Sequence, residues 1–158
     1  MKPVSPKLIP VLQSIYFDEK VAEAQYLAHY ATAANRGLTK FATHILERAG
    51  DERKHADAIG ARLALFEQAP LPYSGKCDPT VGVEIECQEM LDAELPPEIA
   101  AIAKYEAGIK LCVEVGDNDT RDILVANLKD ETEHVHEIET DLGLMELMGS
   151  DNWASAMI

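Results

Sequence analysis

The sequence predicts an all-α fold: a bundle of four long helices with one long crossover and a short fifth helix, forming a single domain over residues 1–158. Three observations predict it. Gly and Pro are sparse, and the stretches between them carry apolar residues at steps of three and four. The sequence has no β-branched run with strict alternation. Two of the expected connections are short and one is long, as in an antiparallel bundle with one crossover.

Five helical segments are expected, the first four of them ended by Gly or by a Pro-rich stretch: residues 6–36, 39–68, 81–115, 119–148 and 152–157. The joints at Gly37 and Gly116 are only a few residues long, so each connects antiparallel neighbours. The connection at residues 69–80 carries three Pro and one Gly, and it is long enough to travel the length of a bundle.

Composition narrows the possible partners. The chain has 158 residues, 47% of them apolar, and a formal net charge of −14. It offers no basic run for nucleic acid, no apolar run near the roughly 20 residues that span a bilayer, and no signal-peptide core. Its three Cys include no CxxC pair, which indicates reduced thiols. We therefore expect a cytoplasmic protein without a nucleic-acid or membrane partner, whose acidity serves solubility or cationic ligands.

The expected core-facing stripe of each long helix contains one Glu: Glu19, Glu52, Glu98 and Glu131. Two of these are followed three residues later, on the same helix face, by His55 and His134. Each buried carboxylate costs several kcal/mol unless it is protonated, paired or metal-bound. Two divalent cations would balance four carboxylates, and oxygen and imidazole donors suit iron or manganese. The pattern, Glu from two helices and Glu-x-x-His from the other two, is the ligand set of di-iron carboxylate bundles.

The third expected helix leaves an alternative open. Glu98 directly follows the segment 95–97, Leu-Pro-Pro, and prolines inside a helix remove backbone donors and favour a kink. A kink would move the stripe and make Glu94 the alternative ligand. We prefer Glu98 because Leu91 and Ile102, on either side of it, keep its phase along the stripe.

Several motifs resemble those of bacterioferritins, which belong to the ferritin superfamily. The matching segments are EKVAEAQY at 19–26, NRGL at 35–38, DERKHAD at 51–57, KDETEH at 129–134 and MGSDNW at 148–153. The resemblance extends from about residue 8 to residue 158. It implies a ferritin-like four-helix bundle that binds two irons per subunit, oxidises Fe(II) with O2 or H2O2, and stores ferric mineral in a homo-oligomeric shell of 24 subunits.

The resemblance also implies a role for each candidate residue. Glu52 and Glu131 would bridge the two irons. Glu19 and Glu98 would be terminal ligands, and His55 and His134 would each bind one iron. Tyr26 would lie beside the centre as a catalytic residue that donates a hydrogen bond or an electron.

One position departs from the family. A Met that directly follows the Glu of the second helix holds the haem of bacterioferritins, and Arg53 occupies that position here. A guanidinium does not bind haem iron, so no haem is expected through Arg53. Its alternative roles are a solvated or interfacial salt bridge. Glu47 and Asp51 would pass iron inward or belong to an exposed acidic face.

Three further residues lie on or near the expected inward faces. We expect His29 to be a hydrogen-bonded core histidine, with a third imidazole ligand as the alternative. Tyr105 is expected to pack in the core, with a hydrogen bond near the metals as the alternative. Trp153, in the short last helix, is expected at a subunit contact.

The expected function is iron storage and detoxification by a ferroxidase. The alternatives are a di-iron peroxidase similar to rubrerythrin, whose paired CxxC motifs are missing from this sequence, or a dimanganese catalase. A non-enzymatic helical interaction protein that binds metal incidentally is a further alternative.

Overall fold

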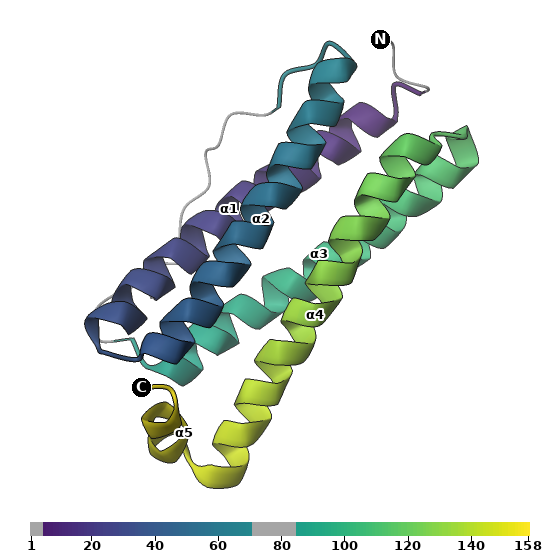
Figure 1. Ribbon diagram of the computed structural model, residues 1–158. Helices are drawn as coiled ribbons and strands as arrows, with labels where there is room; N and C mark the ends of the chain where they lie inside the picture. Colours follow the sequence, from purple (N-terminus) through teal and green to yellow (C-terminus); the bar gives the residue numbers. More distant parts are fainter. Residues whose placement is uncertain (1–4, 71–84) are drawn as a thin grey trace.

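The computed structural model describes residues 5–70 and 85–158. Its helices are, in chain order, α1 (Leu8–Asn35), α2 (Thr39–Leu65), α3 (Cys87–Val115), α4 (Asn118–Met148) and α5 (Ser150–Ala156). The described residues contain no strand, and the predicted all-α fold is confirmed. As Figure 1 shows, α1 and α2 form one antiparallel pair, α3 and α4 form the other, and α5 turns across one end of the bundle.

Helix boundaries agree with the expectation within three residues, except at the start of the third helix. The third helix begins at Cys87 rather than at residue 81, because residues 85 and 86 are not helical and residues 81–84 lie outside the described part. The fifth helix begins at Ser150, two residues earlier than expected. Most of the expected crossover, at 69–80, also lies outside the described residues.

Helix ends follow from local chemistry. Gly116 caps α3 with a φ of 77°, a left-handed conformation that favours glycine. Asp117 then starts α4, since its side chain accepts a hydrogen bond from the backbone N–H of Thr120. At the beginning of α3, Glu86 and Glu89 form a reciprocal capping box. These caps define where α3 ends and where α3 and α4 begin.

Two apolar clusters fill the bundle, one toward each end. The first surrounds Phe41 and Ile45 and includes Trp153 of α5. The second surrounds Leu12 and Ile59. Trp153 is 1% exposed and lies edge-on to Phe41, with ring centroids 5.1 Å apart. The expectation that Trp153 lies at a subunit contact is therefore wrong, because the chain buries this indole itself.

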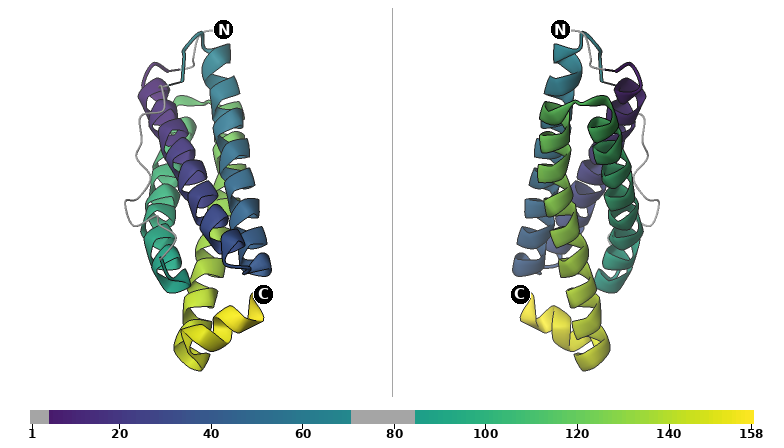
Figure 2. Two further views of the ribbon diagram at one scale, coloured as in Figure 1. Left: turned by 90° about the vertical axis from the view of Figure 1, so that its left-hand side faces the viewer. Right: turned by 90° about the vertical axis from the view of Figure 1, so that its right-hand side faces the viewer.

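The views in Figure 2 show the two helix pairs side by side, with α5 near the α1–α2 turn. Lys40, at the start of α2, holds α5 there by donating from Nζ to the carbonyl of Ala156, 3.0 Å away. Among the described residues, no helix is long and apolar enough to cross a membrane. The middle of the bundle, between the two apolar clusters, contains the polar centre described next.

Candidate metal centre

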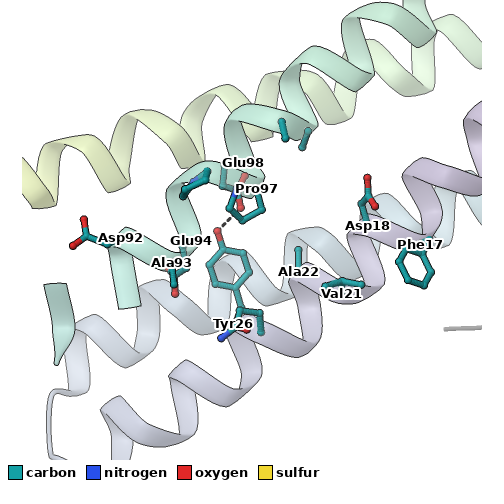
Figure 3. Close-up of a pocket in the computed structure, with 14 residues that line it drawn as sticks. Phe17, Asp18, Val21, Ala22, Tyr26, Asp92, Ala93, Glu94, Pro97 and Glu98 are labelled. Carbon is teal, nitrogen blue, oxygen red and sulfur yellow. Dashed lines mark hydrogen bonds between the residues drawn. The ribbon is translucent and has the colours of Figure 1, made fainter. Parts of the chain in front are cut away.

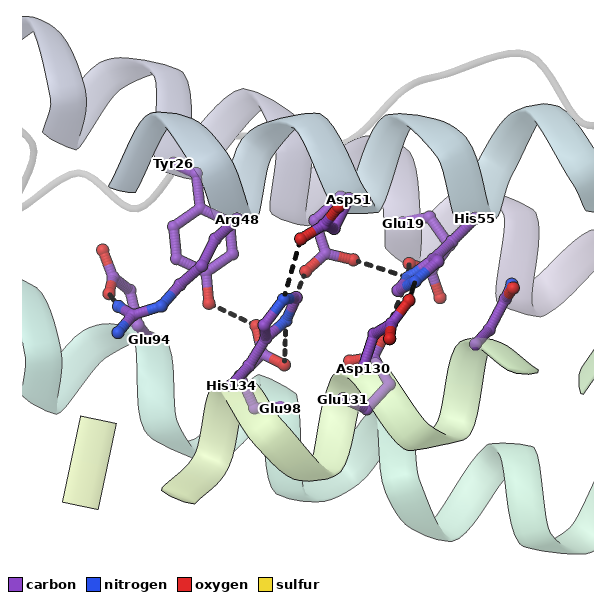
Figure 4. A network of polar contacts seen from close by, with 12 residues as sticks. Glu19, Tyr26, Arg48, Asp51, His55, Glu94, Glu98, Asp130, Glu131 and His134 are labelled. Carbon is purple, nitrogen blue, oxygen red and sulfur yellow. Dashed lines mark hydrogen bonds and ion pairs between the residues drawn. The ribbon is translucent and has the colours of Figure 1, made fainter. Parts of the chain in front are cut away.

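Six acidic and imidazole side chains converge at mid-height in the bundle, contributed by all four long helices: Glu19 from α1, Glu52 and His55 from α2, Glu98 from α3, and Glu131 and His134 from α4 (Figure 4). None exposes more than 4% of its surface. Their ligand atoms form two overlapping groups, and within each group these atoms lie within 4.8 Å of one another. Glu52 and Glu131 belong to both groups.

Each histidine points its Nδ1 atom at the carboxylates. His55 Nδ1 lies 2.9 Å from Glu131 Oε1 and 3.4 Å from oxygens of Glu19 and Glu52. His134 Nδ1 lies 3.2 Å from Glu52 Oε1, and it is 3.5 Å from Glu98 Oε2. Each half of the centre therefore contains one histidine and one glutamate of its own. Glu52 and Glu131 lie between the two halves and are shared by both.

The outer nitrogens of both rings also meet carboxylates. His55 Nε2 lies 3.2 Å from Asp130 Oδ2, and His134 Nε2 lies 3.7 Å from Asp51 Oδ2. A carboxylate at the far nitrogen orients a metal-binding imidazole and raises its basicity. Because the near nitrogen of each ring faces the group of glutamates, this arrangement is typical of histidines that bind a metal through Nδ1.

Five buried atoms of the centre have no hydrogen-bond partner in the described structure: Glu52 Oε1, His55 Nδ1, Glu98 Oε2, Glu131 Oε1 and His134 Nδ1. A buried polar atom left without a partner costs about 1–3 kcal/mol. All five are potential ligand atoms of the two overlapping groups. The donor set therefore fits a pair of divalent cations, which would satisfy these atoms together.

Burial and close contact shift the pKa values of the acidic and imidazole groups in the centre. Burial raises the pKa of Glu19 to about 8 and the pKa of Glu131 to about 10. Burial would also raise the pKa of Glu52, but the adjacent imidazoles of His134 and His55 lower it to about 2. Burial opposes the charged form of His134, but the adjacent carboxylates of Glu52 and Glu98 raise its pKa to about 11. The carboxylates raise the pKa of His55 in the same way, against its burial.

Two tyrosines donate hydrogen bonds to the terminal carboxylates. Tyr26 donates to Glu98 Oε1, as Figure 3 shows. Tyr105 donates to Glu19 Oε1 over 2.7 Å and accepts from Asn127 Nδ2 over 3.0 Å. Tyr105 thus packs in the core, as preferred from the sequence, and also makes the hydrogen bond near the centre that was the alternative for it. Its shared stripe with Glu98 was the available signal, but the sequence alone did not show that its hydroxyl would reach α1.

The structure brings Glu98, and not Glu94, into the centre. α3 continues through Pro96 and Pro97 without interruption, so Glu98 keeps its place on the inward face. Glu94 is also buried, but its oxygens contact His29 and Arg48. The expected core role of His29 agrees with this geometry.

Beside a small cavity of about 40 Å³ lined by residues that include Glu19, Glu52 and Glu98, two larger cavities adjoin the centre. One of about 680 Å³ lies between α1 and α3, lined by residues that include Tyr26, Pro97 and Glu98 (Figure 3). The other, of about 210 Å³, lies between α2 and α4 and is lined mainly by charged groups, among them Asp51 and His134. Of the two acidic residues expected on an inner face, Glu47 is exposed and Asp51 is partly buried.

The position expected to exclude haem lies on the outer surface of α2. Arg53 is exposed, and its guanidinium has donors but no lone pair to offer an iron. The side chain at this position therefore does not fit a haem ligand.

Comparison with known proteins agrees with this geometry. Residues 11–148 match the ferritin-like domain family. The chain is 32% identical over 154 residues to a bacterial ferritin of Pseudomonas aeruginosa, covering 97% of each chain. It is 28% identical over 152 residues to a bacterial ferritin of Neisseria meningitidis, covering 96% of each. It is 28% identical over 153 residues to a bacterioferritin of Mycolicibacterium paratuberculosis, covering 97% of this chain and 94% of the other. The chain thus belongs to the ferritin family.

Proposed function

We propose that this protein is a ferroxidase that stores iron, with Fe(II) as its substrate. The observation that carries the proposal is the pair of overlapping ligand groups with five unpartnered buried atoms at their centre. Oxygen and imidazole donors without a thiolate suit iron. The full-length similarity to ferritins supports iron, rather than another divalent cation, as the substrate.

The ligand roles follow from membership of the two groups. Glu52 and Glu131, which belong to both, would bridge the two ions. Glu19 and His55 would complete one position, which we call the first metal position. Glu98 and His134 would complete the other, the second metal position.

The redox balance is simple. Each of two Fe(II) ions gives up one electron, and O2 takes two electrons and two protons to become H2O2. With H2O2 as the oxidant, two electrons and two protons yield two waters. The iron supplies the redox chemistry, and the protein supplies spacing, charge balance and protection from competing ligands.

The side chains around the centre have defined tasks in this reaction. Binding of the cations would displace the protons that the metal-free centre retains. Tyr26 and Tyr105 each orient one terminal carboxylate by donating to one of its oxygens, which would leave the other oxygen free to bind a metal. Because Tyr26 also lines the larger cavity, we propose it as the catalytic residue that assists electron or proton transfer there.

Storage would require an assembly. We propose one ferritin-like domain over residues 1–158, a homo-oligomeric shell of 24 subunits and a cytoplasmic location, supported by the full-length match to relatives named as ferritins. The net charge of −14 suits a shell that attracts cations.

Stopped-flow measurement of Fe(II) oxidation tests the proposal. Glu131→Ala removes a ligand of both metal positions, and we expect it to abolish rapid oxidation. Glu139→Ala, at an exposed position on the same helix, is the matched control and should oxidise Fe(II) at the wild-type rate. Unchanged kinetics in Glu131→Ala would refute the assignment.

The products distinguish the alternatives. A ferritin should consume O2 and retain a ferric mineral in a large oligomer. Rapid peroxide turnover without mineral growth would instead indicate a peroxidase or catalase. A small oligomer that consumes no O2 with Fe(II) would indicate an interaction protein.

A further inference from the structure

We infer that Glu94 is a positioning residue for the second metal position: together with His29 and Arg48 it forms a buried clamp that holds α3 at its proline pair and so sets where Glu98 meets the metal. The inference rests on the proposed function, because it presupposes two metal positions and holds that these contacts restrain the ligands of only the second. We call His29, Arg48 and Glu94 the Glu94 clamp.

The clamp joins three helices through one carboxylate. Glu94 Oε1, on α3, lies 2.6 Å from Nδ1 of His29 on α1. Its other oxygen accepts from Nη1 of Arg48 on α2 over 3.3 Å. All three side chains are at most 2% exposed. Both oxygens of Glu94 are therefore held by other helices, and the carboxylate is not available as a metal ligand.

The clamp extends across the bundle on both sides. His29 Nε2 contacts Gln25 Nε2 at 2.7 Å, at the wall of the larger cavity. Arg48 donates from Nη2 to Glu137 of α4 over 3.3 Å, on the side of the smaller cavity. Figure 4 shows Arg48 and Glu94 beside Tyr26, toward one end of the metal centre. The polar chain therefore contacts all four long helices one helical turn from the glutamates.

The helix has a physical need for such support here. Pro96 and Pro97 have no N–H, so the carbonyls four residues earlier, at positions 92 and 93, receive no helical hydrogen bond from them. The backbone between Glu94 and Glu98 is thus held by fewer internal bonds than the rest of α3. Contacts to α1 and α2 at Glu94 replace that missing restraint just before the metal-facing carboxylate.

The restraint acts on one metal position only. Glu98 follows Glu94 by one turn on the same helix, and it receives its hydrogen bond from Tyr26, a neighbour of His29 on α1. The first metal position instead depends on Glu19 and His55, and Tyr105 restrains Glu19 from the other side of the centre. Loss of the clamp should therefore weaken the second position and spare the first.

Co(II) binding to the full-length, metal-free protein tests this asymmetry, read by calorimetry and by the visible absorption of the bound ion. His55→Ala isolates the second metal position, and His134→Ala isolates the first. Adding Glu94→Ala should weaken Co(II) binding about tenfold or more in the His55→Ala background. In the His134→Ala background it should weaken binding by less than about twofold. Equal losses in both backgrounds, or no loss in either, would overturn the inference.

A general loss of stability is controlled by an ion pair of similar burial. Asp117 accepts from Arg62 Nη2 over 2.7 Å at the far end of the bundle. Asp117→Ala should lower the free energy of unfolding without changing Co(II) affinity at either position. If Asp117→Ala weakened the second position as strongly as Glu94→Ala, the clamp would have no specific role.

A conservative variant distinguishes the loss of the polar contacts of Glu94 from the loss of its side-chain volume. Glu94→Gln keeps the size of the side chain but offers one amide oxygen to two donors, His29 Nδ1 and Arg48 Nη1, so it should restore only part of the affinity lost in Glu94→Ala. Failure of Glu94→Gln to restore any affinity would contradict the inference.

If Glu94→Ala does not fold, Arg48→Lys performs the same test, because a single ammonium cannot span Glu94 and Glu137 as the guanidinium does. Wild-type protein that binds no pair of Co(II) ions would overturn the proposed function itself, a result distinct from symmetric losses in the variants.

Discussion

Metal binding should release a countable number of protons from the centre. The perturbation is the addition of a redox-inert divalent ion, Zn(II), to the metal-free protein at pH 7. A histidine binds metal only as the neutral ring, and a carboxyl group binds only after it loses its proton. The number of protons released therefore reports how many ligands are protonated before the metal arrives.

The structure supplies the expected number. Burial keeps the pKa values of Glu19 and Glu131 at about 8 and about 10, so both carboxyl groups are mostly protonated at pH 7. His55 and His134 have raised pKa values because of their carboxylate neighbours, and both are cationic. Glu52, with a pKa of about 2, is already ionised. We expect about four protons per bound pair of Zn(II) ions, one from each of the four protonated groups.

Calorimetry in buffers of different ionisation enthalpy measures this number directly. Because the six groups interact, the assay counts the protons that leave the centre as a whole. His134→Ala removes one protonated ligand and one metal position, so it should release fewer protons per chain. Release of less than about one proton per pair in the wild type would refute the reasoning, because the ligands would then be deprotonated before the metal arrives, against the raised pKa values of this buried set.

Three further predictions concern single perturbations. The metal-free protein should lose stability between pH 5 and pH 8. The Glu19 carboxyl keeps its proton up to about pH 8 in the folded chain, but in the unfolded chain it loses the proton near its ordinary pKa of 4.5. The histidines, whose pKa values are also raised by folding, lower the stability further above about pH 6.5. Urea unfolding across this range checks the trend, and a rise in stability would contradict it. Trp153→Ala should cost about 3–5 kcal/mol in the free energy of unfolding because Trp153 is buried against Phe41; a loss below about 1 kcal/mol would be too small for a buried indole. Tyr105→Phe removes the donor to Glu19, so Co(II) affinity should fall about tenfold at the first metal position while the second is spared. An equal loss at both positions would show that Tyr105 does not act through Glu19.

Much of the fold was predictable because its determinants are local. Helical periodicity and glycine stops are properties of short segments, and α1, α2 and α4 begin and end within three residues of their expected bounds. The third helix was less predictable at its start, since its first turn depends on the capping box between Glu86 and Glu89 rather than on apolar spacing. Trp153 was misassigned because its burial depends on how α5 folds back against the start of α2.

By itself, the sequence determined that four glutamates and two histidines share inward helix faces, because a periodicity of 3.6 residues is set by backbone geometry alone. Only the tertiary structure decided what each of them meets. It placed Glu98 in the centre and tied the nearby Glu94 to His29 and Arg48, and it brought Tyr105 within reach of Glu19. Those choices depend on the relative rotation and spacing of separate helices, which are set by the packing of the whole bundle and not by any one segment.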